Sequence, residues 1–152
     1  MAGLKTIPFT GVKRGKVIVK MQPNIPPPKN KRSVLCVEDE RFISELYKRA
    51  LTKAGYDVTV IADGQQALVE ASTNRYDIIL LDLMVPNLTG IDILRSLRDP
   101  RRDPPIKAKI IIITNLEQRD DVRADIEKQA DGYLVKAELT PYELVDFINN
   151  IN

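Results

Sequence analysis

Residues 76–86 read Tyr-Asp-Ile-Ile-Leu-Leu-Asp-Leu-Met-Val-Pro, and this stretch decides the fold. Its centre, residues 78–81, is apolar without alternation, which is typical of a strand covered by helices on both faces. Asp82 stands at the carboxyl end of that run, where open α/β sheets bind their ligands. The stretch therefore predicts a buried central strand that delivers a carboxylate to a functional edge.

Three other short apolar runs also end in polar side chains. The residues that follow or close these runs are Glu38 with Asp39, Thr114, and Lys136. If the strands are parallel neighbours, three acids, one hydroxyl and one ammonium meet at one edge of the sheet. Carboxylate oxygens suit Mg²⁺ or Mn²⁺, and an ammonium suits an anion. The set can therefore hold a divalent metal and a phosphoryl group together.

Strand-like and helix-like segments alternate from Ser33 onward. The predicted strands are 33–38, 57–61, 76–82, 109–114 and 132–136. The predicted helices are about 40–54, 64–73, 89–98, 117–129 and 140–150. Five β–α pairs predict a parallel sheet with helices on both faces.

Two helices carry clear signals. The first has apolar residues near one face, namely Phe42, Ile43, Leu46, Tyr47, Ala50 and Leu51. The last opens on Thr140-Pro141-Tyr142-Glu143, which combines a cap, a proline in the first turn and a capping-box glutamate.

Composition excludes several classes of protein. The 152 residues predict one domain, and 43% apolar residues supply a full core. The single cysteine, Cys36, excludes a disulfide framework and a cysteine-based zinc site, and it is expected to be a buried thiol. No histidine is present, so histidine acid–base chemistry and histidine-ligated metals are excluded. We expect a cytoplasmic protein, because neither a membrane span nor a signal peptide is recognisable.

Charge divides the chain into two regions. Residues 1–32 carry eight basic residues and no acidic ones, whereas residues 33–152 carry a net charge of −6. The first region also contains three consecutive prolines, and we expect it to be a mostly disordered tail. Such a tail could bind nucleic acid, an acidic protein partner or a membrane surface, or serve only as a solubilising extension. Residues 33–152 are expected to form the folded domain.

The motifs Val34–Glu40, Ile78–Pro86, Ile111–Thr114 and Gly132–Lys136 occur in an order and spacing that resemble a response-regulator receiver domain of two-component signalling. The resemblance covers about residues 33–150. It implies a flavodoxin-like, doubly wound five-stranded parallel sheet of order 2-1-3-4-5. The chain ends one helix after Lys136, so we expect a stand-alone receiver with no output domain.

The resemblance also implies roles for individual residues. Asp82 would be the phospho-acceptor, and Mg²⁺ would be held by Glu38, Asp39, Asp82 and the backbone carbonyl of Met84. Thr114 would bond a phosphoryl oxygen, Lys136 would bridge to the phosphate, and Tyr133 would be a rotating switch aromatic. The donor would be a phosphohistidine of a sensor histidine kinase or of a phosphotransfer protein. The output would be a surface change that a separate downstream protein recognises. The chain itself would act as a monomer or as a dimer that forms on phosphorylation.

Two positions depart from the family pattern. Lys136 is followed by Ala137, where the family usually has a proline in a cis bond, and a cis bond before a non-proline residue costs about 3 kcal/mol. Asn115 follows Thr114, where a small residue is frequent, and we expect it to restrict the path to Tyr133.

Other classes of function fit the residues less well than the receiver does. A pseudo-receiver, acting as an interaction module without phosphorylation, is the main alternative, although the complete set of site residues argues against it. An aspartate-dependent hydrolase of the dehalogenase type would need an acid two residues after its nucleophile, where Met84 stands. A flavin protein of this fold would need a Ser-, Thr- or Gly-rich loop at residues 38–40, which read Glu-Asp-Glu. We therefore expect no enzyme beyond catalysis of its own phosphorylation and dephosphorylation.

Overall fold

The computed structural model describes residues 31–115 and 117–151. The fold is that of the compact unit Arg32–Asn152. The expectation of a disordered basic tail falls almost entirely on residues 1–30, which lie outside the described residues.

Five strands and five α-helices alternate along this unit. The strands are β1 (Ser33–Val37), β2 (Asp57–Ile61), β3 (Ile78–Leu81), β4 (Lys109–Thr114) and β5 (Gly132–Val135). The helices are α2 (Arg41–Lys53), α3 (Gly64–Ala71), α4 (Gly90–Leu97), α5 (Asp120–Gln129) and α6 (Pro141–Asn150), and a 3₁₀ turn, η1 (Lys136–Glu138), follows β5.

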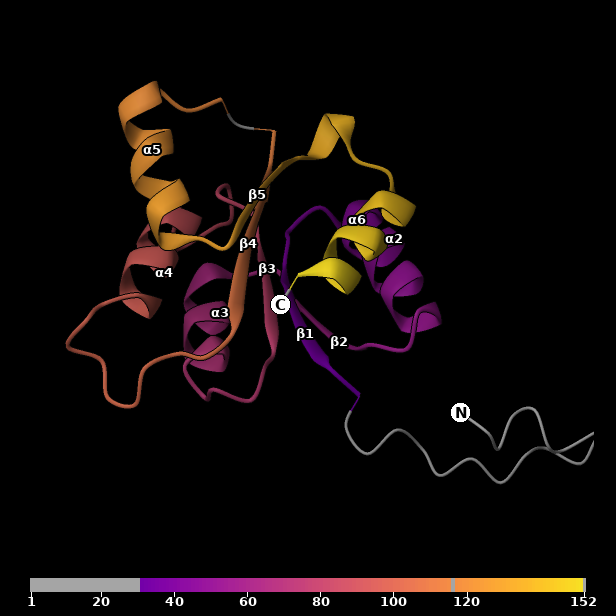
Figure 1. Ribbon diagram of the computed structural model, residues 1–152, viewed down its shortest axis with the longest axis horizontal. Coiled ribbons are helices and arrows are strands. Elements are labelled where there is room, and N and C mark those ends of the chain that lie inside the picture. Colours follow the sequence, from indigo (N-terminus) through magenta and orange to yellow (C-terminus); the bar gives the residue numbers. More distant parts are fainter. Residues whose placement is uncertain (1–30, 116, 152) are drawn as a thin grey trace, which may run out of the picture. The chain divides into compact units, whose positions relative to one another are not determined.

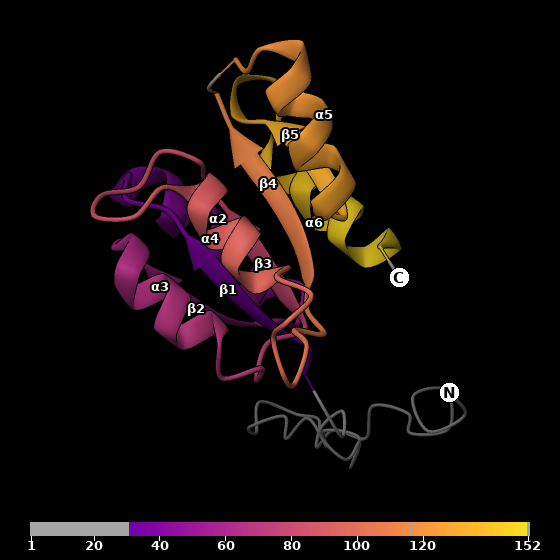
Figure 2. The same ribbon diagram turned by 90° about the vertical axis from the view of Figure 1, so that its left-hand side faces the viewer.

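The strands form one parallel sheet of order β2-β1-β3-β4-β5. The predicted doubly wound, flavodoxin-like architecture is therefore confirmed. Val37 pairs with Leu81, Leu81 with Ile112, and Thr114 with Val135, so the strands end close to one another at the carboxyl edge. Figure 2 shows that the arrows of β1 and β4 point toward the same side.

Helices cover both faces of the sheet. Helices α3, α4 and α5 lie on one face, and α2 and α6 lie on the other (Figure 1). The buried side chains divide in the same way, and alternation along β4 sends Ile110 and Ile112 to the first cluster and Ile111 and Ile113 to the second. All four residues of β3 are at most 1% exposed, as expected for a strand covered on both sides.

Local signals set the ends of the helices. The capping box of α6 is present, because the Thr140 hydroxyl accepts a hydrogen bond from the Glu143 amide and the Glu143 carboxylate accepts one from the Thr140 amide. Gly55 ends the turn after α2 with φ +98°, a backbone conformation that side chains other than glycine rarely adopt.

The structure corrects several predicted boundaries. Helix α5 begins at Asp120 rather than at residue 117, with Asp120 and Asp121 in its first turn, where acids favour the positive end of the helix dipole. Strand β3 begins at Ile78 rather than at residue 76. Phe42 was expected on the packed face of α2 but is 75% exposed. No helix within residues 31–115 and 117–151 has the length and apolarity to cross a membrane.

Candidate functional site

Asp82 lies one residue beyond β3 and is 4% exposed. Its backbone amide donates to the carbonyl of Val37 (3.1 Å), which extends the pairing of β1 and β3 by one residue. Its Oδ1 accepts a hydrogen bond from the Met84 amide at 3.1 Å. A Cβ added to Gly90 would lie only 2.3 Å from the Asp82 carbonyl oxygen, so glycine is needed for the close approach of α4 to this turn.

The ammonium of Lys136 is surrounded by carboxylates. Its Nζ lies 2.7 Å from Oδ2 of Asp82, 2.5 Å from Oε2 of Glu38 and 3.4 Å from Oε1 of Glu40. The Lys136 side chain is 6% exposed. Burial alone would lower the pKa of Lys136, but the hydrogen bonds and negative charges of Asp82 and Glu38 together outweigh it and raise the pKa above its ordinary value. The side chain is therefore a fixed cation at the acceptor carboxylate.

Glu38 is 3% exposed and follows β1 directly. Burial raises the pKa of its carboxyl, and the hydrogen bond from Lys136 opposes that rise. Its Oε1 accepts from the backbone amide of Glu40 at 3.0 Å. The carboxylate is thus held in place from two sides.

Glu38, Asp39 and Asp82 form an acidic cluster that could hold a metal ion. One carboxylate oxygen from each residue lies within 4.8 Å of the others. Glu38 and Asp82 are buried, while Asp39 is exposed and open to solvent. Three hard oxygen donors, two of them buried, fit a small divalent cation such as Mg²⁺, because like charges at this spacing repel unless a cation offsets them.

A cleft of about 230 Å³ opens over these groups. Its lining consists of Asp39, Glu40, Asp82, Met84, Thr114, Asn115 and Lys136. Thr114, the last residue of β4, is 2% exposed. The predicted site residues other than Glu38 and Tyr133 therefore line one cleft, and Glu38 adjoins it through Lys136.

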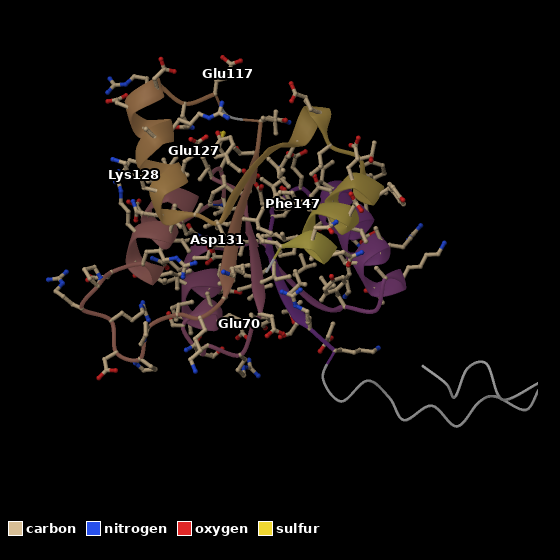
Figure 3. The ribbon with its side chains drawn as sticks, in the orientation of Figure 1. Glu70, Glu117, Glu127, Lys128, Asp131 and Phe147 are labelled. Atoms are coloured by element: carbon tan, nitrogen blue, oxygen red, sulfur yellow. The ribbon has the colours of Figure 1, made fainter. Side chains whose placement is uncertain are left out.

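Tyr133 lines a second, larger cavity of about 590 Å³ next to the cleft. The guanidinium of Arg123 lies 4.7 Å from the centroid of the Tyr133 ring, in a cation–π contact. Glu117 also lines this cavity. In Figure 3, Glu117 lies beyond the carboxyl end of β4, and Glu127 lies on α5. Thr114 and Asn115 belong to the linings of both cavities.

The peptide bond between Lys136 and Ala137 is trans, since the cis bond found within the described part of the chain is Asp103–Pro104. Lys136 nevertheless reaches Asp82, so the loss of the proline leaves this contact intact. The Ala137 amide donates to Oδ1 of Asn115 at 2.7 Å.

Sequence reasoning missed Glu40 and Arg123 as contributors to the site, and it noted Asn115 only as a restriction on the path to Tyr133, not as a hydrogen-bond acceptor. The position of Glu40 directly after two acids gave a signal, because a third carboxylate near the strand end can also reach the lysine. Nothing in the sequence signals the contacts of Asn115 and Arg123, which depend on how the β4–α5 segment lies against β5.

This fold and this cluster of side chains define a class of protein. Residues 34–149 match the model of the response regulator receiver domain family, so the chain belongs to that family.

Known proteins of this class resemble the chain in sequence and structure. It is 36% identical over 118 residues to "Response regulator ArlR" of Staphylococcus saprophyticus, covering 78% of this chain and 50% of that protein. The Francisella response regulator 1452 receiver domain superposes with a TM-score of 0.69 at 31% identity, covering 80% of this chain and 96% of that one. The BeF3-activated N-terminal receiver domain of Klebsiella pneumoniae RstA does so with a TM-score of 0.66 at 26% identity, covering 79% and 97%. The chain spans about half the length of the curated relatives it matches.

Proposed function

We propose that the chain is a phospho-accepting receiver in which Asp82 takes a phosphoryl group from the phosphohistidine of a sensor histidine kinase or phosphotransfer protein. The observation that carries this proposal is the 2.7 Å contact between Lys136 Nζ and Asp82 Oδ2 inside a group of buried acids. A fixed cation beside a carboxylate at the mouth of a cleft suits an anionic ligand that joins that carboxylate.

The transfer requires a nucleophile, an electrostatic partner and a hydrogen-bond donor. A carboxylate oxygen of Asp82 would attack phosphorus while the bond to the imidazole nitrogen breaks, leaving an aspartyl phosphate and a histidine. The ammonium of Lys136 would pair with a phosphoryl oxygen, and the hydroxyl of Thr114 would donate to another. The chain's catalysis is thus confined to its own phosphorylation and dephosphorylation.

Mg²⁺ would be held by the carboxylates of Glu38, Asp39 and Asp82 and by the backbone carbonyl of Met84. When bound, it supplies positive charge that offsets the repulsion between a carboxylate and an incoming phosphoryl group. Lys136 already neutralises part of this cluster, and Asp39 remains accessible from the cleft.

We further propose that Thr114 and Tyr133 form the switch. Both residues line the 590 Å³ cavity, which gives the ring of Tyr133 space to turn toward Thr114. A phosphoryl group on Asp82 that draws the Thr114 hydroxyl toward itself would favour that turn, and the surface of α5 and β5 would change for a downstream protein or a second copy of the chain.

A phosphorylation experiment tests the acceptor. The full chain is incubated with Mg²⁺ and phosphoramidate, and the modified residue is located by mass spectrometry. Label on Asp82 that disappears in Asp82→Ala supports the proposal. Asp57→Ala is the matched control, because Asp57 is an exposed acid at the amino end of β2, and it should be labelled like the parent chain. A chain that stays unlabelled while a known receiver is modified would instead be a pseudo-receiver that acts only by binding.

Beryllofluoride tests the switch without phosphorylation. The solved RstA receiver is described as BeF3-activated, so the same phosphoryl mimic is the natural probe here. Adding it with Mg²⁺ should change the ring signals of Tyr133 in NMR spectra. Spectra that are identical with and without the mimic would reject the switch while leaving phosphorylation of Asp82 open to its own test.

A further inference from the structure

One hydrogen bond joins the two segments that end at the candidate phosphoryl-binding residues. The Oδ1 atom of Asn115 accepts from the backbone amide of Ala137 at 2.7 Å, across 22 positions of sequence. Asn115 directly follows Thr114, and Ala137 directly follows Lys136. We propose that Asn115 is a positioning residue, which holds the turn after β5 so that Lys136 stays aligned on Asp82. This inference rests on the function proposed above.

The turn after β5 needs an acceptor from elsewhere in the chain. The amide of Ala137 lies in the first turn of η1, where backbone N–H groups have no partner within the helix. Val135, which occupies the N-cap position of η1, supplies no side-chain hydrogen bond. Asn115, which directly follows β4, therefore serves as the cap and fixes where the turn lies relative to the end of β4.

The identity of residue 137 makes this bond possible. A proline at this position would have no N–H to donate, whereas Ala137 in a trans peptide has one. The two departures from the family pattern are thus partners in one contact.

The hydrogen bond between Asn115 and Ala137, here called the bridge, lies where a small displacement has a large effect. The Lys136 side chain runs from this turn to Asp82, and a 2.7 Å contact is lost when its base moves by about 1 Å. Thr114 and Asn115 line both the acceptor cleft and the Tyr133 cavity. A displacement of Thr114 therefore passes through Asn115 to the backbone that carries Lys136.

A double-mutant cycle on the full-length chain tests the bridge. Asn115→Ala removes the acceptor, Ala137→Pro removes the donor, and the double variant removes both. Asn150→Ala is the control, because Asn150 also makes an exposed 2.7 Å side-chain hydrogen bond to a backbone carbonyl, that of Asp146 in α6. Two readouts concern the reaction: the rate of phosphorylation by phosphoramidate at saturating Mg²⁺, and the Mg²⁺ affinity. The third is the NMR chemical shift of the Lys136 Nζ, measured without Mg²⁺ or phosphoramidate.

The proposal predicts a specific pattern. Asn115→Ala should slow phosphorylation about fivefold, the worth of one such hydrogen bond, with the Mg²⁺ affinity changed less than twofold, because Asn115 is not among the acidic ligands. In the Ala137→Pro background, Asn115→Ala should have no further effect. Asn150→Ala should leave the rate unchanged.

Other results overturn it. Equal effects of Asn115→Ala with and without Ala137→Pro would show that Asn115 acts by another route. Should Ala137→Pro fail to fold, an Asn115→Ala chain with an unchanged phosphorylation rate and an unshifted Lys136 Nζ signal would overturn it alone. The Lys136 signal also separates the two proposals: if the parent chain is never phosphorylated but the signal still shifts in Asn115→Ala, the receiver chemistry fails and the bridge stands.

Discussion

Lys136 and Asp82 are 54 positions apart in sequence, yet the lysine Nζ lies 2.7 Å from the aspartate Oδ2. The same ammonium contacts Glu38 at 2.5 Å, so one cation serves two buried carboxylates. These contacts place the lysine in competition with any metal ion that the same carboxylates bind.

Replacing Lys136 with methionine should strengthen Mg²⁺ binding while it slows phosphorylation. Removing one positive charge beside the acidic cluster should raise the Mg²⁺ affinity about tenfold, which corresponds to ~1.4 kcal/mol of binding free energy. This is well below the Coulomb repulsion between an unscreened ammonium and a metal ion bound to the same carboxylates. Phosphorylation should slow because no cation meets the phosphoryl oxygen. Isothermal titration and phosphoramidate labelling measure the two effects. Lys128→Met, at an exposed position on α5, should change neither, and unchanged Mg²⁺ affinity in Lys136→Met would contradict the competition.

Gly90→Ala should lower both stability and phosphorylation. The new Cβ would meet the Asp82 carbonyl oxygen at 2.3 Å and the Leu83 Cα at 2.7 Å, and such overpacking costs about 1–3 kcal/mol of unfolding free energy. The turn that carries Asp82 must shift to relieve it. Gly55→Ala is the comparison, since it meets no atom within 4 Å and costs about 1 kcal/mol through its positive φ alone. Chemical denaturation measures the loss of stability, and phosphoramidate labelling measures the rate of phosphorylation. A Gly90→Ala chain that is phosphorylated as fast as Gly55→Ala would show that the turn carrying Asp82 has not moved.

Arg98→Ala should destabilise the fold by about 2–4 kcal/mol. The guanidinium of Arg98 donates to the carbonyls of Gln129, Ile106 and Ala108 and to the carboxylate of Asp131, and its side chain is only 21% exposed. Its loss leaves these acceptors partly unsatisfied in the loop before β4 and at the end of α5.

Arg101→Ala provides the control for Arg98. Arg101 also pairs with an aspartate, Asp99, but is 89% exposed, so its loss should change stability by less than about 0.5 kcal/mol. Both values come from urea denaturation. Equal losses for the two arginines would argue that the bonds of Arg98 contribute no more than a surface ion pair.

Stability should decline in alkali from about pH 9. Burial raises the pKa of the Cys36 thiol from 9.0 to about 12, and burial raises the pKa of the Tyr47 hydroxyl from 10.0 to about 12. At pH values between the ordinary and the raised pKa of each group, the unfolded chain releases a proton that the folded chain retains. The free energy of unfolding therefore falls as pH rises, by up to ~1.4 kcal/mol per pH unit for each group. Below pH 9 both contributions are fully present.

Cys36→Ala isolates the thiol. Urea denaturation between pH 9 and 10, before Tyr47 contributes fully, should show a shallower decline for the variant than for the parent chain. Parallel declines would mean that the thiol is not the group responsible. The parent thiol should also resist alkylation at pH 8 until the chain is unfolded, because only the thiolate reacts.

Much of the fold follows from local patterns. The runs 78–81 and 110–113 are apolar without alternation, and both proved to be central strands covered on two sides. The Thr140–Glu143 capping box marks the start of α6, and the structure contains it. The site followed from topology, because residues after parallel strands must meet at one edge once the strand order is known.

The remaining features depend on tertiary contacts that no local pattern encodes. Phe42 is an exception, because the helical period itself accounts for its exposure: at about 100° per residue it lies about 180° around α2 from the buried Leu51. The η1 turn forms where the side chain of Asn115, the residue after β4, accepts a hydrogen bond from the Ala137 amide. The four acceptors of Arg98 come from two separate segments, residues 106–108 and 129–131, so only the folded chain brings them together.

The alternation of side chains along β4 has a consequence for how the protein tolerates change. Neighbouring isoleucines of this strand belong to different halves of the interior, and among the described residues the two buried clusters have no member in common. A substitution in the cluster beneath α2 and α6 can change the packing beneath α3, α4 and α5 only by shifting the backbone of the sheet. Each half can therefore accumulate mutations largely independently, and combined substitutions from opposite halves should have additive costs.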